Sequence, residues 1–149
     1  MLVTMEEVVN QLNRDEPNYE QAAQLGEAAI PHLIALIHGG DVGLAAKATS
    51  LAGIMNVSQS AAVLETAAQH PEPVVRVAAA ASAKNLTQVP TSLAMKLLGD
   101  FDAGVRNLTL KSLELQHTPG IRQKVAEIVE NDPVAGLRER ARNILKHLP

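Results

Sequence analysis

Histidine and acidic side chains are the residues of this chain that could bind a metal or transfer protons. Two histidines bind one ion from a helix when they lie four residues apart, but His32 and His38 are six residues apart and no His-Glu dipeptide occurs. The chain contains no cysteine, which excludes a thiolate nucleophile, a disulfide and a cysteine-based zinc site. We therefore expect no metal site and no cofactor.

Two pairs of acids are close enough in sequence for general acid-base chemistry, namely Glu6 with Glu7 and Asp100 with Asp102. Each pair stands at the start of an apolar, helix-like segment, where a carboxylate accepts hydrogen bonds from free backbone N–H groups. The glycine-rich patterns that hold phosphates and the GxSxG pattern of serine hydrolases are absent. These observations predict a chain without catalytic residues that is not an enzyme.

Basic side chains gather in the last helix-like segment and raise a third chemistry, nucleic-acid binding. They are Arg138, Arg140, Arg142 and Lys146. Proteins that bind unpaired bases stack them on aromatic rings, whereas Tyr19 and Phe101 are the only aromatic residues here and the pI is about 5.9. A repeat array must also end on a polar outer face, which explains the charges. Of three function hypotheses, nucleic-acid binding through this segment ranks last, and we do not expect it.

The segments that carry these residues recur with a period near 31 residues. One apolar column, with separations of 31, 30 and 32 residues, contains Leu44, Val75, Val105 and Leu137. The next position contains Ala45, Arg76, Arg106 and Arg138. Such a period, with apolar residues three and four positions apart, predicts helical hairpins that bury their apolar faces against neighbouring copies. The expected units span residues 29–56, 57–88, 89–117 and 118–149, after a degenerate unit at 1–28.

Helix starts are marked most plainly in the second helix of each unit. An acid precedes this helix at Asp41, Glu72 and Asp102, and Pro73 and Pro133 suit a first helical position, which needs no N–H donor. The sequence therefore predicts an all-α chain with a single domain over residues 1–149. Its expected architecture is an α-solenoid, a right-handed superhelix of about five stacked antiparallel hairpins.

The segments DAGVRNLTLKSL and PEPVVRVAAAASAKNL share an acid, a valine-arginine pair and then small or apolar residues. With the period near 31, they resemble short HEAT repeats of the phycobilisome-lyase-like subtype, an armadillo-like helical fold, over about residues 18–148. The resemblance implies a protein-binding array. It leaves an accessory role in a bilin lyase-like or chromophore-removal system as the alternative. It also implies that the arginine of each unit forms a ladder with acids of adjacent units.

The arginine column is therefore interpreted as structural. Arg76 follows Glu72, and Arg106 follows Asp102, by four residues, the spacing at which opposite charges meet on one helix face. Arg138 continues the column in the last unit, whereas the first full unit has an alanine there. We expect the ladder to be interrupted in that first full unit.

A candidate partner-binding surface lies on one side of the second helices, the side that lines the inner curve of such arrays. Its residues are two, six and nine positions after the apolar column and include Val77, Ala81, Lys84, Asn107, Lys111, Glu114, Asn143 and Lys146. Leu110 is added because on a helical wheel it points away from the other leucines, so we expect it to be exposed. Our leading hypothesis is a non-catalytic scaffold that binds a protein or peptide along this surface.

Net charge changes along the chain, from −5 in residues 1–40 to +2 in residues 111–149. No apolar run reaches the roughly 20 residues of a membrane span, and the first ten residues carry acids where a signal peptide carries bases. We expect a cytoplasmic protein with no membrane partner. The two exposed ends of the array leave homodimerisation open.

Overall fold

The computed structural model describes residues 2–148, which form ten α-helices and two short 3-10 helices, without a β-strand in that range. The α-helices are α1 (Met5–Leu12), α2 (Tyr19–Ala23), α3 (Ile30–His38), α4 (Val42–Met55), α5 (Ser60–Ala67), α6 (Pro73–Ser82), α7 (Thr91–Leu98), α8 (Ala103–Leu113), α9 (Arg122–Asn131) and α10 (Ala135–Leu145). The 3-10 helices are η1 (Glu27–Ala29) and η2 (Ala83–Asn85). None of the described helices is long and apolar enough to cross a membrane.

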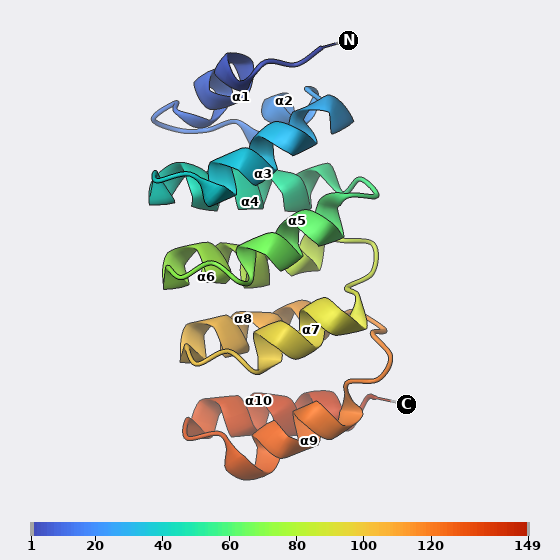
Figure 1. Cartoon of the computed structure of the whole chain (residues 1–149). Helices are drawn as coiled ribbons and strands as arrows, with labels where there is room; N and C mark the ends of the chain where they lie inside the picture. Colours follow the sequence, from blue (N-terminus) through green and yellow to red (C-terminus); the bar gives the residue numbers. More distant parts are fainter. Residues whose placement is uncertain (1, 149) are drawn as a thin grey trace.

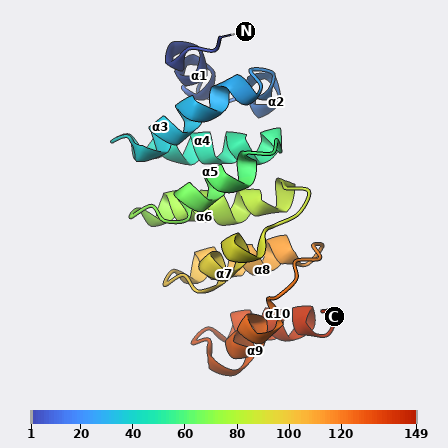
Figure 2. The same cartoon turned by 45° about the vertical axis from the view of Figure 1, so that its right-hand side comes forward.

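The helices form two layers that run the length of the molecule. The odd-numbered helices α3, α5, α7 and α9 lie in front of their even-numbered partners in Figure 1, and the order is the same in the turned view of Figure 2. Along the even-numbered layer, each helix from α2 to α10 contacts the next, and α3, α5, α7 and α9 contact one another in turn. The predicted fold class is confirmed, because the chain is an all-α solenoid of stacked hairpins.

The helix starts explain why the repeat register could be found in the sequence. The N-cap residues of the last four even-numbered helices are Asp41, Glu72, Asp102 and Val134. The apolar column of Leu44 and its three counterparts lies three residues after each of these caps. The carboxylates of Asp41 and Asp102 accept hydrogen bonds from the N–H groups of Leu44 and Val105, at 3.0 and 3.1 Å.

One helix starts later than the sequence indicates. Pro133 is predicted at the first position of α10, but the helix begins at Ala135. The carboxylate of Asp132 accepts a hydrogen bond from the N–H of Val134 at 3.0 Å, and Val134 itself is extended. This bond holds a turn where the proline suggested a helix. Pro73 is the first residue of α6, as predicted.

Small residues set the distance between neighbouring even-numbered helices. The fully buried alanines of α4, α6 and η2 are Ala45, Ala48, Ala52, Ala79, Ala80 and Ala83. A close approach occurs at Gly53 of α4, where a Cβ atom would lie 2.7 Å from the Cβ of Ser82 in α6. Helices that meet through such residues can pack at the short end of the usual range of about 8–10 Å. The alanine-rich composition is therefore a consequence of close layer packing.

Candidate functional site

Arg76 of α6 connects two repeat units. Its Nε and Nη2 atoms donate to the two carboxylate oxygens of Asp100 at 2.9 and 3.4 Å. Its Nη1 atom donates to the carbonyl oxygens of His70 and Pro71 at 2.9 and 3.0 Å. Because a bidentate arginine-carboxylate pair is both strong and directional, it fixes how the two units sit against each other.

Arg106 of α8 repeats this arrangement one unit later. Its Nε and Nη2 atoms donate to the carboxylate of Asp132 at 2.8 and 3.2 Å, and its Nη1 atom donates to the carbonyl oxygens of Asp100 and Phe101 at 3.0 Å each. Arg138, in the last unit, donates to the carbonyl oxygen of Asp132 at 2.6 Å. Each of the three arginines thus binds the carbonyl group two residues before the N-cap of its own helix.

The structure corrects the predicted acidic partners of this ladder. Glu72 is exposed and forms no ion pair within residues 2–148, and the carboxylate of Asp102 is used at the start of α8. Side chains in the first turn of a helix tilt toward its N-terminus. The arginines therefore point toward the preceding loop and the next unit, where they meet Asp100 and Asp132.

Asp132 is a buried acid that carries two structural roles. Burial raises the pKa of its carboxyl group, but hydrogen bonds from Arg106 and from the N–H of Val134, together with the charges of Arg106 and Arg138, outweigh this effect and hold the pKa below its usual range. The carboxylate is therefore charged at neutral pH. It starts α10 and pairs with α8 at the same time.

The ladder is interrupted between α4 and α6 at both of its positions. Ala45 replaces the arginine, and His70 replaces the acid. The Nδ1 atom of His70 accepts a hydrogen bond from the N–H of Glu72 at 3.0 Å, just as the carboxylate of Asp100 accepts one from the N–H of Asp102 at 2.9 Å. The imidazole of His70 thus supports the start of its helix, but it binds no arginine side chain within residues 2–148.

The predicted partner-binding surface is partly exposed and partly used inside the stack. Exposed members are Lys84, Lys111, Glu114, Asn143 and Lys146, and half-buried members are Val77, Ala81 and Asn107. Leu110 is fully buried, so the prediction that it is exposed is wrong. Helix α8 packs against α6, α7, α10 and η2. A helix enclosed from several directions buries more than one stripe of residues, and a helical wheel built on one stripe misplaces the rest.

Arg140 of α10 binds two members of this predicted surface. Its Nε atom donates to the side-chain oxygen of Asn107 at 3.0 Å, and its Nη1 atom donates to the carboxylate of Glu114 at 2.7 Å. Both contacts join the last two units. Sequence reasoning missed them because residues 33 and 26 positions apart leave no local pattern.

The other basic residues of α10 are also largely engaged. Arg142 pairs with Glu139 at 2.6 Å, and Arg138 is held by the carbonyl group of Asp132. Within residues 2–148, Lys146 forms no ion pair. These contacts favour a structural role for the helix over an electrostatic surface for nucleic acid.

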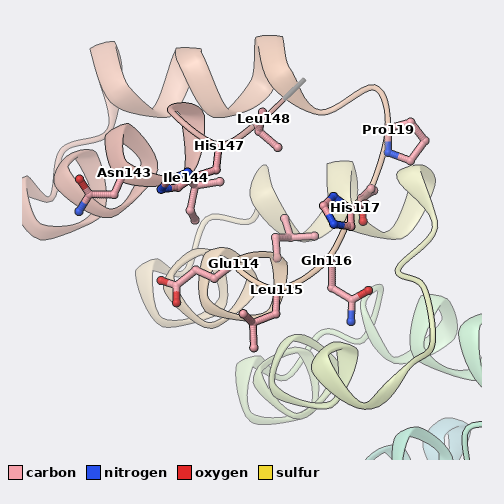
Figure 3. A pocket seen from close by; sticks show the side chains of 11 residues that line it. Glu114, Leu115, Gln116, His117, Pro119, Asn143, Ile144, His147 and Leu148 are labelled. Carbon is pink, nitrogen blue, oxygen red and sulfur yellow. The ribbon is translucent and has the colours of Figure 1, made fainter.

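A cavity of ≈ 450 Å³ lies between the segment that follows α8 and the end of α10 (Figure 3). Residues 113–119 form one wall, and the opposite wall consists of Asn143, Ile144, His147 and Leu148. Small-molecule sites have volumes of about 300–1,000 Å³ and combine apolar walls with a few polar groups, as this cavity does. Among the residues predicted for the partner surface, Glu114 and Asn143 line it.

Leu115 is exposed at this surface, whereas Leu110, for which exposure was predicted, is buried. Its side chain is 93% exposed and stands beside Glu114 and Gln116 at the cavity (Figure 3). Single exposed leucines are common on protein surfaces, but the place of Leu115 beside the cavity makes it available for apolar contact with a ligand or partner. It was missed because α8 ends at Leu113, and beyond a helix there is no periodicity from which to assign a face.

His117 and His147 line the cavity from its opposite walls (Figure 3). They are 30 residues apart, one repeat period, and were not singled out because neither has a metal-binding neighbour in sequence. In residues 2–148, no group of three or more histidine, cysteine or acidic residues is arranged to hold a metal ion. The two imidazoles can instead form hydrogen bonds with polar groups of a ligand.

The stack is similar to a solved structure over almost its whole length. It matches a chain of the complex of CpcE and CpcF of phycocyanin lyase from Nostoc sp. PCC7120 with a TM-score of 0.72 and 19% identity, covering 94% of this chain and 96% of that chain. No protein-family model matches the sequence, and no curated protein matches it. At this identity the likeness shows the fold alone, an array of stacked helical hairpins.

Proposed function

We propose that this chain is a non-catalytic binding subunit that works with a protein partner, as an accessory of a bilin lyase-like or chromophore-removal system. The observation that carries the proposal is the cavity between α8 and α10, with the exposed Leu115 at its edge. Leu113, Ile144 and Leu148 supply apolar contact, while His117 and His147 supply hydrogen bonds. A linear tetrapyrrole or an apolar side chain of a biliprotein has the matching chemistry.

The end-to-end likeness to a chain of a phycocyanin lyase complex supports the same proposal. That chain is part of a two-protein complex by its description, so association with a second protein is a natural mode of action for this fold. The distribution of polar and apolar groups at the cavity agrees with an interface that has an apolar centre and a polar rim.

The test mixes the purified chain with a bilin and with a biliprotein, and measures the absorption spectrum and co-elution on a sizing column. We expect a shifted bilin band or a co-eluting complex. Leu115→Asp should abolish either effect without unfolding the chain, because Leu115 is 93% exposed. The matched control is Val74→Asp, which places an acid at a 51% exposed apolar residue of α6. Unchanged spectra and separate elution would reject this form of the proposal.

A scaffold for a different protein is the second candidate, supported by three exposed lysines: Lys84 in η2, Lys111 in α8 and Lys146 at the C-cap of α10. Replacing Lys111 and Lys146 by glutamate should weaken capture of an acidic partner while the helical circular dichroism stays unchanged. Light scattering over a concentration series separates this case from homodimerisation, because a dimer raises the mass of the isolated chain.

A further inference from the structure

Two cavities occupy equivalent places in the stack, each beside the ends of consecutive odd-numbered helices. The first, at the ends of α7 and α9, is lined by Ile128, Asn131 and Asp132 among others. The second, at the ends of α3 and α5, is lined by Thr66, Gln69 and His70 among others. Both sets lie six, three and two residues before the N-cap of the following helix. The chain therefore contains two versions of one site.

The two cavities differ in whether an arginine of the ladder lines them. The guanidinium group of Arg106 lines the first cavity, which has a volume of ≈ 230 Å³. The equivalent residue at the second cavity is Ala45, which is fully buried, and this cavity has a volume of ≈ 380 Å³. The interruption of the ladder thus coincides with a larger open space where the other units place a guanidinium group.

Hydrogen-bond acceptors remain at the second cavity. Arg76, Arg106 and Arg138 each donate to the carbonyl oxygen two residues before their own N-cap. In the α4 unit this residue is Gly39, which lines the cavity, and no hydrogen bond from residues 2–148 reaches its carbonyl oxygen or that of Gly40.

The local charge also favours a cation. Glu72 lines the cavity, is exposed, and forms neither an ion pair nor a side-chain capping bond in the described part of the chain. Asp41 is the N-cap of α4 and lies in sequence between the lining residues Gly39 and Val42. The histidines at this cavity are His38 and His70, and His70 uses Nδ1 as an acceptor for the N–H of Glu72.

We propose that this cavity binds a guanidinium group supplied from outside the chain, in the position that the arginine ladder leaves empty at Ala45. The carbonyl groups of Gly39 and Gly40 and the carboxylate of Glu72 are the acceptors, and the walls of α3 and α5 enclose the stem. The group belongs either to an arginine side chain of a protein or to a free guanidinium compound. Because His70 replaces the aspartate of the other units, the contact is weaker than the internal ladder and therefore reversible.

The first test titrates the 15N-labelled chain with N-acetylarginine amide, with an acetylated Gly-Gly-Arg-Gly-Gly peptide, and with N-acetyllysine amide. We expect saturable amide shifts at Gly39, Gly40 and Glu72 with both arginine probes and a several-fold weaker response to lysine, which lacks the planar fork. Tighter binding of the peptide would assign the group to a protein, and equal binding would assign it to a free compound. Equal or stronger binding of lysine would overturn the proposal.

Variants then locate the site. His70→Asp restores the acid of the ladder and should tighten binding of the arginine probes about tenfold, as expected for a bidentate pair. Glu72→Gln should weaken binding of the arginine probes several-fold, whereas the matched change at the exposed Glu130 of α9, Glu130→Gln, should not. Ala45→Arg should abolish binding by filling the cavity from within. Absence of saturable shifts in both the unmodified chain and His70→Asp would overturn the proposal, as would weaker binding by His70→Asp.

Discussion

Arg106 and Asp132 are joined across the boundary between the last two repeat units by two hydrogen bonds of 2.8 and 3.2 Å, with 11% and 3% of their side chains exposed. The same carboxylate accepts the N–H of Val134 at 3.0 Å, just before α10. One acid therefore supports the start of the last even-numbered helix and also ties it to α8, in addition to the contacts of Arg140 with Asn107 and Glu114.

Removing one partner of this pair should be costly. Arg106→Ala leaves the buried carboxylate of Asp132 without its main counter-charge, and we expect the free energy of unfolding to fall by about 3 kcal/mol. Urea unfolding followed by circular dichroism measures the change. The control is Arg142→Ala, which removes an exposed pair with Glu139 and should cost less than about 0.5 kcal/mol. Equal effects of the two variants would contradict the structural role of the ladder.

The stability of the chain should depend on pH through Asp132. Its pKa is lower in the folded chain than in the unfolded chain, so folding favours the charged form. The stabilisation of the fold by ionised Asp132 is complete above about pH 5. It is lost as the pH falls below about 4 and through the pKa of the folded chain. We expect Asp132→Asn to be less stable than the unmodified chain at pH 7, with a difference that shrinks toward pH 3. The matched control is Asp15→Asn, at an exposed side chain, which should leave the free energy of unfolding at pH 7 almost unchanged.

The contact between α4 and α6 should not tolerate an added methyl group. In Gly53→Ala the new Cβ would lie 2.7 Å from the Cβ of Ser82, so the helices must separate, and we expect a loss of about 1–3 kcal/mol. Gly136→Ala is the matched control, because a Cβ there meets no atom within 4 Å. It should raise stability by up to about 1 kcal/mol through helix propensity. Thermal unfolding of both variants measures the difference, and a neutral Gly53→Ala would contradict the close packing.

Two leucines five residues apart should behave in opposite ways. Leu110→Ala opens a cavity in the core and should cost about 2–5 kcal/mol, whereas Leu115→Ala changes a 93% exposed side chain and should leave the unfolding midpoint almost unchanged. Denaturant titration of both variants tests the assignment. A large loss of stability in Leu115→Ala would show that the exposed leucine is part of the core.

Periodic features of the fold could be predicted from the sequence, whereas contacts between units could not. The column from Leu44 to Leu137 was visible because each member lies three residues after a helix start, a relation local to one helix. The partner of Arg76 is Asp100, 24 residues away in the next unit, and the four-residue spacing to Glu72 favoured the wrong acid. A spacing along one helix carries no information on how the next unit is rotated against it.

At the cavity beside α8 and α10, residues on helices could likewise be predicted from the sequence, whereas residues beyond the helix ends could not. Glu114 and Asn143 were predicted from their positions on helices and line the cavity beside α8 and α10. Leu115, His117 and His147 line it too, but they lie beyond the ends of their helices, where side-chain direction depends on the path of the chain. The cavity itself exists only because two segments one repeat apart come together.

The junctions between neighbouring even-numbered helices differ along the stack. A close contact of Gly53 with Ser82 joins α4 to α6, whereas charged contacts join α10 to α8. The close contact of α4 with α6 involves no titratable group, whereas Asp132 holds the start of α10 against α8 through Arg106. Acid below about pH 4, which begins to protonate Asp132, should therefore weaken the junction of α8 with α10 and leave that of α4 with α6 intact. Amide hydrogen exchange would then rise first in α9 and α10, and the array would come apart from its carboxyl-terminal unit inward rather than all at once.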